Sequence, residues 1–416
     1  MRTSKDINTF YHQYIKSLVR FIVPEGARTL IIDDPNMDLG KTQGTFEYIV
    51  ATDILGSVYD IERFLVDART RLVADGRIVI TQYSTLWEPI LRLASWLKLR
   101  SPSVEQNWIS PHDLQNFLHL AGFEVVKSGG KMLFPKYIPL ISTFFNTILA
   151  NVWPFSALCL IRYAVARPLP EKKTGQKPSL SIIVPARNEA GTIQRIVDEL
   201  PELGVFTEII FIEGHSTDNT FAEMERVAKA YQGTKRISVA VQEGRGKGDA
   251  VRKGFDMASG DILSIFDADM TVPPEEIEKF YRAIVENRGE FINGSRLVYP
   301  VEKGAMRLLN FFGNKFFSFA FSAILGQPLK DTLCGTKVLW KKDYEAIKAN
   351  RAFFGDFDPF GDFDLLFGAS KLNLKIVEVP VHYRDRVYGV TNISRWKHGW
   401  LLLRMTLFAA RKLKFR

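Results

Sequence analysis

Short apolar runs alternate with amphipathic stretches along the first part of the chain. Runs of about four mostly apolar residues between polar residues are typical of buried strands, and apolar positions three or four residues apart are typical of helices. The pattern predicts strands at 29–32, 48–51, 77–80 and 123–126, and helices at 61–72 and 111–121. Because strands alternate with helices, we expect a parallel α/β sheet.

The same alternation is clearer in the second half of the chain. It predicts strands at 180–184, 208–212, 237–241 and 262–266, and helices that begin near Thr192 and cover 220–230 and 248–258. This order is typical of a doubly wound α/β sheet, whose ligands bind at the carboxyl ends of the strands. The candidate site residues below follow such strands, which favours a genuine site.

A polar segment separates the two alternating regions. Residues 167–178 contain proline, lysine and glycine with few apolar residues, as linkers do. We therefore expect an N-terminal domain at 1–166, a linker at 167–178, a second domain at 179–393 and a basic amphipathic helix at 394–416.

Composition narrows the class of partner. The 416 residues include 55 Lys and Arg against 46 Asp and Glu, a net charge of +9 that suits a nucleotide, a lipid phosphate or a membrane surface. Nucleic acid is not expected, because no aromatic and basic recognition motif is present. Cys159 and Cys334 are too few for a disulfide framework, which favours a reducing compartment. The polar first 16 residues do not resemble a signal peptide.

Three apolar segments, at 137–161, 311–325 and 396–416, fall short of the roughly 20 uninterrupted apolar residues of a spanning helix. The last mixes leucine and tryptophan with lysine and arginine, which is typical of a helix in the membrane interface; the alternative is a helix packed on its own domain. The phenylalanines of the second are either core or a platform for an isoprenoid tail. We expect a cytoplasmic protein, peripheral on the inner face of the plasma membrane.

Two carboxylates follow the strand at 262–266. Asp267 and Asp269 can converge on one cation as the chain leaves the sheet. Hard divalent cations such as Mg²⁺ and Mn²⁺ prefer oxygen ligands and keep positions open for phosphate. A metal there would neutralise a diphosphate leaving group. Alone, this triplet also fits a solvated acidic turn.

Three further motifs surround the acidic triplet in a fixed order. The first strand ends in Val-Pro-Ala-Arg-Asn-Glu at 184–189, and the second ends in Glu-Gly-His-Ser-Thr-Asp at 213–218. A glycine-rich basic loop at 244–250 precedes a helix and suits a phosphate group. As an ordered set, these motifs resemble those of the family 2 glycosyltransferases of the GT-A fold, over about residues 179–393.

Within that family, the chain is most similar to the polyprenyl-phosphate sugar synthases, such as the dolichol-phosphate-mannose synthases. The similarity rests on Gly-Ser-Arg at 294–296, on the aspartate segment at 331–337 and on 386–392, which resembles an Arg-x-x-Gly-x-Ser phosphate motif. It implies an inverting, metal-dependent transfer from a nucleoside-diphosphate sugar to a polyprenyl phosphate in cell-envelope synthesis.

The resemblance also implies roles for individual residues. Asp267 and Asp269 would bind Mg²⁺ or Mn²⁺ and the diphosphate, and Arg296 and Arg386 would hold the acceptor and donor phosphates through their planar forks. The residues expected to bind the nucleotide sugar are Pro185, Ala186, Glu189, Glu213, Asp218, Lys247, Asp249 and Asp267. Residues 214–215 depart from the family's Asp-Asp-Gly-Ser segment, so the nucleobase is not predicted.

The acceptor decides whether a general base is needed. A lipid phosphate is already an anionic nucleophile and needs only alignment and charge neutralisation. A sugar hydroxyl on a growing polysaccharide or glycolipid would need a base, and Asp362 or Asp364 could serve. A silent, partner-binding scaffold that kept the fold is a third hypothesis.

The N-terminal domain resembles the later part of a class I methyltransferase. Residues 46–55 resemble the fourth strand of that fold and 74–80 the strand after it. A glycine-rich SAM loop should follow the strand at 29–32, but Asp-Asp-Pro-Asn stands at 33–36. The resemblance implies an incomplete Rossmann sheet, which we expect to bind no SAM and to act as a scaffold, a partner surface or a membrane aid.

Overall fold

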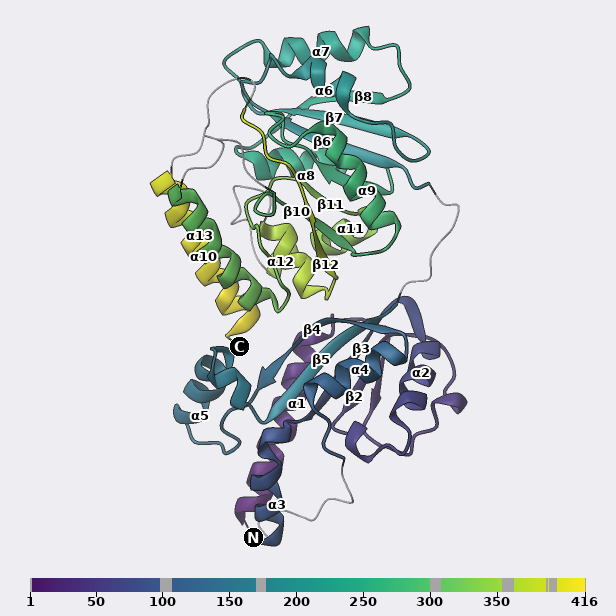
Figure 1. Ribbon diagram of the computed structural model, residues 1–416, viewed down its shortest axis with the longest axis vertical. Coiled ribbons are helices and arrows are strands. Elements are labelled where there is room, and N and C mark those ends of the chain that lie inside the picture. Colours follow the sequence, from purple (N-terminus) through teal and green to yellow (C-terminus); the bar gives the residue numbers. More distant parts are fainter. Residues whose placement is uncertain are drawn as a thin grey trace. The chain divides into compact units, whose positions relative to one another are not determined.

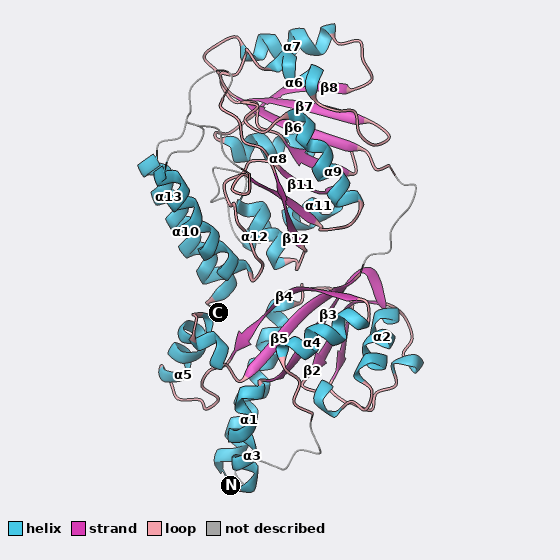
Figure 2. Ribbon diagram, viewed as in Figure 1, coloured by secondary structure: helices cyan, strands magenta, loops and turns pink. Residues whose placement is uncertain are grey.

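The computed structural model describes residues 2–97, 107–169, 177–299, 308–353, 363–386, 388 and 395–415. The chain divides into two compact units, shown in Figures 1 and 2. The first comprises Met1–Glu171 together with Lys414–Arg416, and the second comprises Lys172–Leu413. Each unit is built on its own β-sheet.

The first unit has a five-stranded sheet in the order β1-β2-β3-β5-β4. Its strands are β1 (Thr29–Ile32), β2 (Phe46–Thr52), β3 (Leu72–Tyr83), β4 (Phe123–Lys131) and β5 (Ile161–Pro168). β1, β2 and β3 are parallel, but β5 runs antiparallel to both β3 and β4. The four predicted strands, β1 to β4, therefore all run in the same direction, as expected, but a strand that the local pattern did not reveal, β5, lies antiparallel between β3 and β4.

Helices cover both faces of this sheet. They are α1 (Arg2–Ile22), α2 (Ile61–Arg71), α3 (Glu88–Trp96), α4 (Pro111–Leu120) and the single turn α5 (Ile141–Thr143). α2 and α4 pack on one face and α1 on the other. The start of α4 is fixed by a capping box, in which the Ser110 hydroxyl and the Asp113 carboxylate bond each other's backbone N–H. Between β1 and β2 the chain forms only a loop with one 3₁₀ turn, η1 (Leu39–Lys41).

The second unit has a seven-stranded sheet in the order β12-β10-β11-β9-β6-β7-β8. Its strands are β6 (Leu180–Ala186), β7 (Thr207–Glu213), β8 (Arg236–Val241), β9 (Ile262–Ile265), β10 (Phe291–Ser295), β11 (Lys337–Trp340) and β12 (Ile376–Pro380). The four strands β8, β7, β6 and β9 are parallel, and β11 is antiparallel to β9 and β10. β6 and β9 are buried along nearly their whole length, as central parallel strands are.

The helices of the second unit enclose two cores, one on each face of the sheet. They are α6 (Ile193–Glu199), α7 (Thr220–Ala230), α8 (Lys247–Met257), α9 (Ile277–Val285), α10 (Leu308–Leu325), α11 (Lys341–Ala349), α12 (Phe363–Lys371) and α13 (Arg395–Ala409). The helix predicted at 220–230 coincides with α7, and the four strands predicted in this half coincide with β6 to β9 within two residues at each end.

Apolar side chains of α10 and α13 face in more than one direction. Phe317 and Phe321 are buried in the core, whereas Phe316 and Phe319 are exposed; the side chains of residues 311–312 lie outside those described. On α13, Leu402 and Met405 are buried, while Trp400 and Leu407 are exposed. Among the helices of the described residues, none has the length and apolar content needed to cross a bilayer.

Candidate active site

Two aspartates mark the carboxyl end of β9. The turn that carries them is closed by the Met270 N–H, which donates to the Asp267 carbonyl at 3.2 Å, with Met270 at φ 54°. Asp269 Oδ1 accepts from the backbone N–H of Thr271 at 3.2 Å and from its hydroxyl at 2.9 Å. These bonds fix the Asp269 carboxylate beside that of Asp267.

Each aspartate is met by a cation from another element. Lys247, the first residue of α8, places Nζ 2.6 Å from Asp267 Oδ1. Gly246 before it has φ 87°, a conformation that glycine adopts without strain, and so directs Lys247 to the sheet edge. Arg386, which follows β12, places Nη2 2.8 Å from Asp269 Oδ2 and donates through Nη1 to Glu189 Oε1.

Burial and charge move the carboxyl groups of this cluster in opposite directions. Burial raises the pKa of Asp267, but Lys247 and more distant cations outweigh it, and the net pKa lies below the ordinary value. Burial and the neighbouring Asp267 charge raise the pKa of Asp269 despite Arg386. Burial raises the pKa of Glu189 to about 7, against the opposing effect of Arg386. The cluster therefore carries acid groups whose charge depends on the cations around them.

The loop before β11 closes over Asp267. A Cβ at Gly335 would lie 1.9 Å from Asp267 Oδ2 and 2.6 Å from Lys247 Nζ, so any other residue there would have to displace both side chains. In the same segment, the buried Lys337 ammonium donates to the Cys334 carbonyl. The sequence pattern marked 331–337 as one segment but gave no signal that its glycine contacts the carboxylate.

Arg296 at the end of β10 is held by a buried partner. Its Nε and Nη2 donate to the two oxygens of Asp331 at 2.7 and 2.9 Å, and its backbone N–H also bonds that carboxylate. Asn314 of α10 donates to the same aspartate at 3.1 Å. Burial raises the pKa of Asp331, but Arg296 outweighs it and the pKa lies far below the ordinary value. This bidentate pair keeps Arg296 fixed at the sheet edge.

The ends of β6 and β7 form the side expected to hold the nucleoside. Pro185 and Ala186 end β6 and pair with the last residues of β7, Ile212 and Glu213. The Glu213 carboxylate accepts from the Ser216 N–H. Because β6 is parallel to both β7 and β9, the carboxyl ends of the three strands lie on one edge of the sheet.

Two further predicted residues shape the loops there. Asp218 accepts from the N–H of Thr220 at 3.0 Å, and the Thr220 hydroxyl accepts from the Glu189 N–H at 2.9 Å. Asp249 accepts from the Gly244 N–H at 2.7 Å and so folds the glycine-rich loop back onto α8. His215, at φ 58°, places Nε2 3.2 Å from the Gly244 carbonyl.

Of the two predicted base candidates, Asp364 is within the described residues. Asp362 lies outside the described residues. Asp364 is buried near the start of α12, with Arg351 Nε 3.8 Å away. Asp331 and Thr271, which hold Arg296 and Asp269, were not singled out as such partners from the sequence, because both bonds depend on tertiary folding.

The donor set at the end of β9 fits a hard divalent cation. Within the described residues no group of three or more His, Cys, Asp or Glu side chains is positioned to hold a metal. Asp267 and Asp269 offer two carboxylates side by side, each already paired with a cationic group. A Mg²⁺ or Mn²⁺ ion needs more oxygen ligands than these two, and diphosphate oxygens can complete the shell.

The sheet of the first unit ends in a carboxylate of a different kind. Asp53 follows β2 at φ 55° and accepts from the Tyr11 hydroxyl at 2.6 Å and the Thr81 hydroxyl at 2.9 Å. Tyr11 belongs to α1, is buried and stacks on Tyr83 with ring centroids 5.3 Å apart. Tyr11 of α1 and Thr81 of β3 thus each donate a hydroxyl hydrogen bond to the Asp53 carboxylate.

Part of each unit matches a known family model. Residues 181–348 match the model described as glycosyl transferase family 2, and residues 16–128 match that of a methyltransferase domain. The glycosyltransferase AglJ of Haloferax volcanii is 28% identical over 226 residues, 54% of this chain and 69% of the relative.

Two other relatives are named for lipid phosphates. The UDP-N-acetylglucosamine–dolichyl-phosphate N-acetylglucosaminyltransferase of Methanococcus voltae is 28% identical over 217 residues, 48% of this chain and 83% of the relative. The dolichol-phosphate mannosyltransferase of Saccharomyces cerevisiae is 38% identical over 110 residues, 25% of this chain and 40% of the relative.

Among solved structures, glucosyl-3-phosphoglycerate synthase from Mycobacterium tuberculosis in complex with UDP is 18% identical, with a TM-score of 0.41, and the match covers 57% of this chain and 80% of that one.

Proposed function

We propose, from the premise that this chain carries a family 2 glycosyltransferase domain, that it moves a sugar from a nucleoside-diphosphate sugar to a polyprenyl phosphate with inversion at the anomeric carbon. The observation that carries the proposal is the carboxylate pair Asp267 and Asp269, set at the carboxyl end of β9 and paired with Lys247 and Arg386. Acidic and basic groups in one cluster can receive both a cation and a phosphate.

The donor diphosphate is held by groups from two sides. Lys247 and the backbone N–H groups at the start of α8 face the anion with positive charge and dipole. Asp267 and Asp269 would hold Mg²⁺ or Mn²⁺, which when bound neutralises charge on the leaving diphosphate. Because Lys247 and Arg386 now pair with these aspartates, both side chains become available to phosphate oxygens once another cation takes their place.

The acceptor needs alignment rather than a base. A phosphate monoester oxygen is already anionic, so in-line attack on the anomeric carbon requires only that its charge be compensated and its position fixed. Arg386 is suited to this role through its planar fork. Arg296 and Asp331 would fix the neighbouring loop. The lipid phosphates in the names of the Methanococcus and yeast relatives support the same acceptor class.

A location and a role for the first unit complete the proposal. We place the enzyme on the cytoplasmic face of the plasma membrane, where the exposed side chains of α10 and α13 would meet the lipid that carries the acceptor phosphate. The methyltransferase-like unit would serve as a scaffold without SAM. Binding of SAM to the full chain in a titration would contradict that part.

A donor panel tests the reaction. The full chain is incubated with Mn²⁺, a short polyprenyl phosphate and GDP-mannose, UDP-glucose, UDP-N-acetylglucosamine or UDP-galactose in turn, and lipid-linked sugar is detected by mass spectrometry. We expect one donor to give a product of inverted configuration. Transfer only to a glycan hydroxyl, with no lipid-linked product from any donor, would support the polysaccharide alternative with its Asp362 or Asp364 base. No transfer to any acceptor would support the silent scaffold.

A further inference from the structure

A segment of the first unit exposes its apolar side chains. Residues 137–158 form α5, the π-helical turn η4 (Phe144–Ile148) and the 3₁₀ turns η5 (Leu149–Asn151) and η6 (Phe155–Leu158), beside the ends of β4 and β5 (Figure 1). Leu140 is 85% exposed and Trp153 80% exposed. The other exposed apolar side chains here are Tyr137, Ile141, Phe144, Ile148, Val152, Phe155 and Leu158.

Three polar side chains of the same segment, those of Ser142, Asn146 and Asn151, are buried. Asn146 is buried, accepts from the N–H groups of Leu133 and Phe134 at 2.8 Å each and donates to the Phe134 carbonyl at 2.8 Å. Ser142 is buried and donates to the Ile138 carbonyl at 2.7 Å. The segment is therefore held together by hydrogen bonds on its inside and covered with apolar groups on its outside.

This arrangement is the reverse of what water favours. In a soluble subdomain apolar side chains lie inside, and large contiguous apolar patches are rare on monomers. Leu140 adds a second cost, because it has φ 65°, a conformation that glycine or asparagine adopts far more readily than leucine. Tryptophan and tyrosine beside aliphatic side chains are typical of residues at a membrane interface.

Charge distinguishes a lipid surface from an apolar protein partner. The sequence has no Asp or Glu from Val125 to Pro170, whereas Lys127, Lys131, Lys136 and Arg162 fall in that stretch. Arg167 also lies there, but it is buried in an ion pair with Glu124. An acid-free apolar segment with basic residues around it matches an anionic bilayer, whose negative surface potential attracts basic residues close to it.

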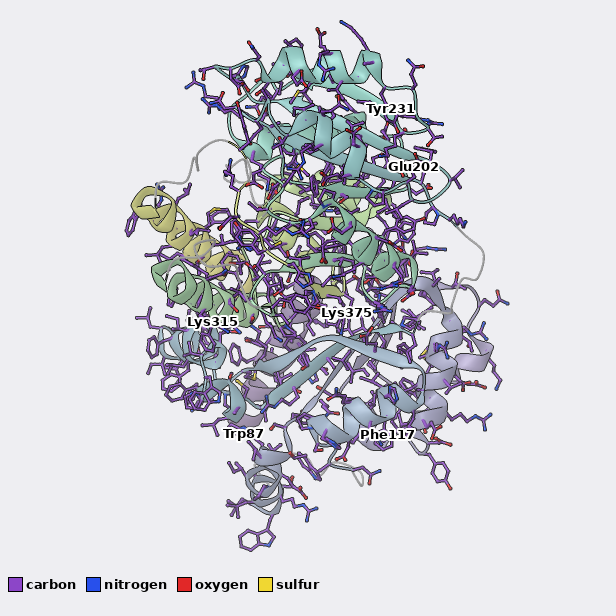
Figure 3. All side chains as sticks on the ribbon, turned by 45° about the horizontal axis from the view of Figure 1, so that its top comes forward. Trp87, Phe117, Glu202, Tyr231, Lys315 and Lys375 are labelled. Atoms are coloured by element: carbon purple, nitrogen blue, oxygen red, sulfur yellow. The ribbon has the colours of Figure 1, made fainter. Side chains whose placement is uncertain are left out.

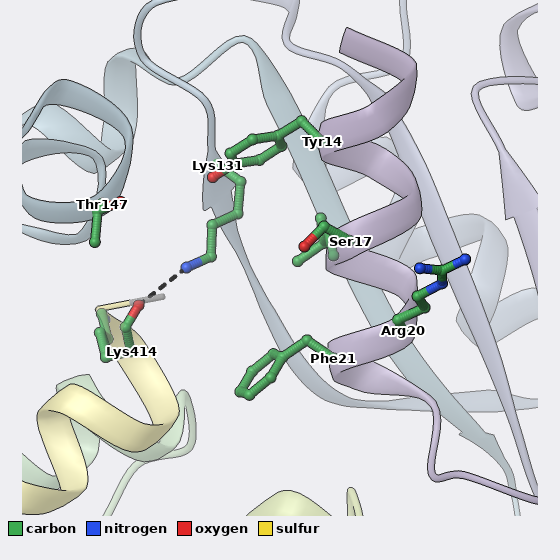
Figure 4. A pocket seen from close by; sticks show the side chains of 8 residues that line it. Tyr14, Ser17, Arg20, Phe21, Lys131, Thr147 and Lys414 are labelled. Atoms are coloured by element: carbon green, nitrogen blue, oxygen red, sulfur yellow. Dashed lines mark hydrogen bonds between the residues drawn. The ribbon is translucent and has the colours of Figure 1, made fainter. Parts of the chain in front are cut away.

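A cationic pocket adjoins the segment (Figure 4). It has a volume of about 290 Å³ and is lined by Tyr14, Ser17, Leu18, Arg20, Phe21, Lys131, Thr147 and Lys414. None of these eight described residues is acidic. Lys131 Nζ lies 2.6 Å from Asn151 Oδ1 and 3.3 Å from the Lys414 carbonyl, both uncharged acceptors. The pocket thus presents positive charge next to Thr147 of η4, as a phosphate headgroup requires.

A hydrogen bond ties a second apolar helix to this segment. The indole N–H of Trp87, labelled in Figure 3, donates to the Leu158 carbonyl at 2.7 Å. α3 begins at the next residue and exposes Ile90, Leu93 and Trp96. The exposed apolar surface therefore continues from η6 into α3.

We propose that residues 137–158 seat the methyltransferase-like unit on an anionic phospholipid bilayer, with Leu140 and Trp153 entering the acyl boundary and Arg20 and Lys131 facing headgroup phosphates. This binding surface goes beyond the transfer reaction and does not depend on it. It gives the first unit a task that needs no SAM.

Vesicle flotation of the full chain tests the proposal. We expect the double variant Leu140→Glu/Trp153→Glu to bind vesicles of phosphatidylcholine and phosphatidylglycerol at least about tenfold more weakly, since burial of one large apolar side chain contributes roughly 1.5–3 kcal/mol. The control is Tyr59→Glu, an exposed residue of the same unit outside the segment. Arg20→Gln should reduce the preference for vesicles that contain phosphatidylglycerol over vesicles of phosphatidylcholine alone.

Three outcomes would contradict the proposed membrane-binding surface. Equal vesicle binding by the double variant and the Tyr59→Glu control would remove it, and so would an Arg20→Gln protein that keeps its full lipid preference. Loss of a dimer in light scattering, with vesicle binding unchanged, would assign the patch to a second copy of the chain. Donor hydrolysis and circular dichroism of the same proteins test whether the catalytic unit and the fold are intact. A loss of vesicle binding can therefore be distinguished from a failure of the proposed reaction.

Discussion

The two units each end a parallel strand with a carboxylate, and they surround it differently. In the first, Asp53 accepts hydrogen bonds from the neutral hydroxyls of Tyr11 and Thr81. In the second, Asp267 and Asp269 pair with Lys247 and Arg386. A carboxylate at the end of a parallel strand thus accepts hydrogen bonds from neutral hydroxyl groups in the first unit, and belongs to a cluster of opposite charges in the second.

The difference concerns what can replace the partner. A neutral hydroxyl satisfies a carboxylate without cancelling its charge, and the buried Tyr11 ring is held by packing against Tyr83. A lysine or arginine side chain cancels the charge and can swing away when a metal ion or a phosphate offers a better partner. We infer that lysine and arginine partners, which a ligand can replace, indicate a ligand-binding sheet edge better than the carboxylates alone do.

The largest effect is expected at the carboxylate pair. Asp269→Asn keeps the shape and the Thr271 hydrogen bonds but removes the charge, so transfer to the lipid phosphate should fall about 10³-fold. The measurement is initial-rate product formation at saturating donor. Asp198→Asn, on the exposed side of α6, is the matched control and should retain full activity. Equal rates in the two variants would refute the metal site.

A smaller loss is expected from crowding the same carboxylate. The Cβ of Gly335→Ala would displace Asp267 Oδ2 and Lys247 Nζ, both side-chain atoms, so turnover should fall about 100-fold while the unfolding temperature changes little. Gly313→Ala in α10 is the control, because a Cβ there meets nothing within 4 Å. If both variants turn over normally, the tight fit at Gly335 plays no part in catalysis.

The edge of the first unit should respond in stability only. Tyr11→Phe leaves Asp53 with one hydroxyl fewer, so the free energy of unfolding should fall by about 1–3 kcal/mol. Turnover should stay at the wild-type value. Denaturant unfolding and the transfer assay measure the two quantities, and a large loss of turnover would show that the first unit takes part in the reaction.

The smallest effects are expected in the pH dependence of folding stability, which Glu189 and Lys131 should change in opposite directions. The pKa of Glu189 is raised from 4.5 to about 7, so the folded state holds a proton that the unfolded state has lost, and stability should fall as pH rises through that window. The pKa of Lys131 is lowered by burial from 10.5 to about 8, so stability should rise between those values. In a plot of unfolding temperature against pH, Glu189→Gln should remove the fall between pH 4.5 and about 7, and Lys131→Met should remove the rise between about 8 and 10.5. If either slope is unchanged in its variant, that group is solvated in the folded protein.

Local pattern predicted the parallel parts of the fold best. Strands 29–32 and 180–184 and helix 220–230 are set by apolar spacing within the segment itself, and the structure has them there. β5, β10, β11 and β12 were not predicted; of these, β5 and β11 run antiparallel to both of their neighbours, and such return strands depend on pairing across long stretches of sequence. α1 was not predicted either, although its buried residues Tyr11, Ile15, Leu18 and Ile22 recur at the three- to four-residue spacing of an amphipathic helix.

The site shows the same division. The order of the motifs predicts that Asp267, Asp269 and Lys247 lie together, because successive parallel strands end at one edge of a sheet. The bond from Arg386 to Glu189 joins residues 197 positions apart, and that from Arg296 to Asp331 joins residues 35 apart. Neither pair has a local signal, so the motifs indicate the residues but not their partners.

The place of Arg386 after β12 has a consequence for synthesis of the protein. β12 is an outermost strand of its sheet and follows every other described strand along the chain, so a nascent chain on the ribosome carries Asp267 and Asp269 before the arginine that pairs with Asp269 is made. Until translation passes residue 386, the Asp269 carboxylate therefore lacks this guanidinium partner.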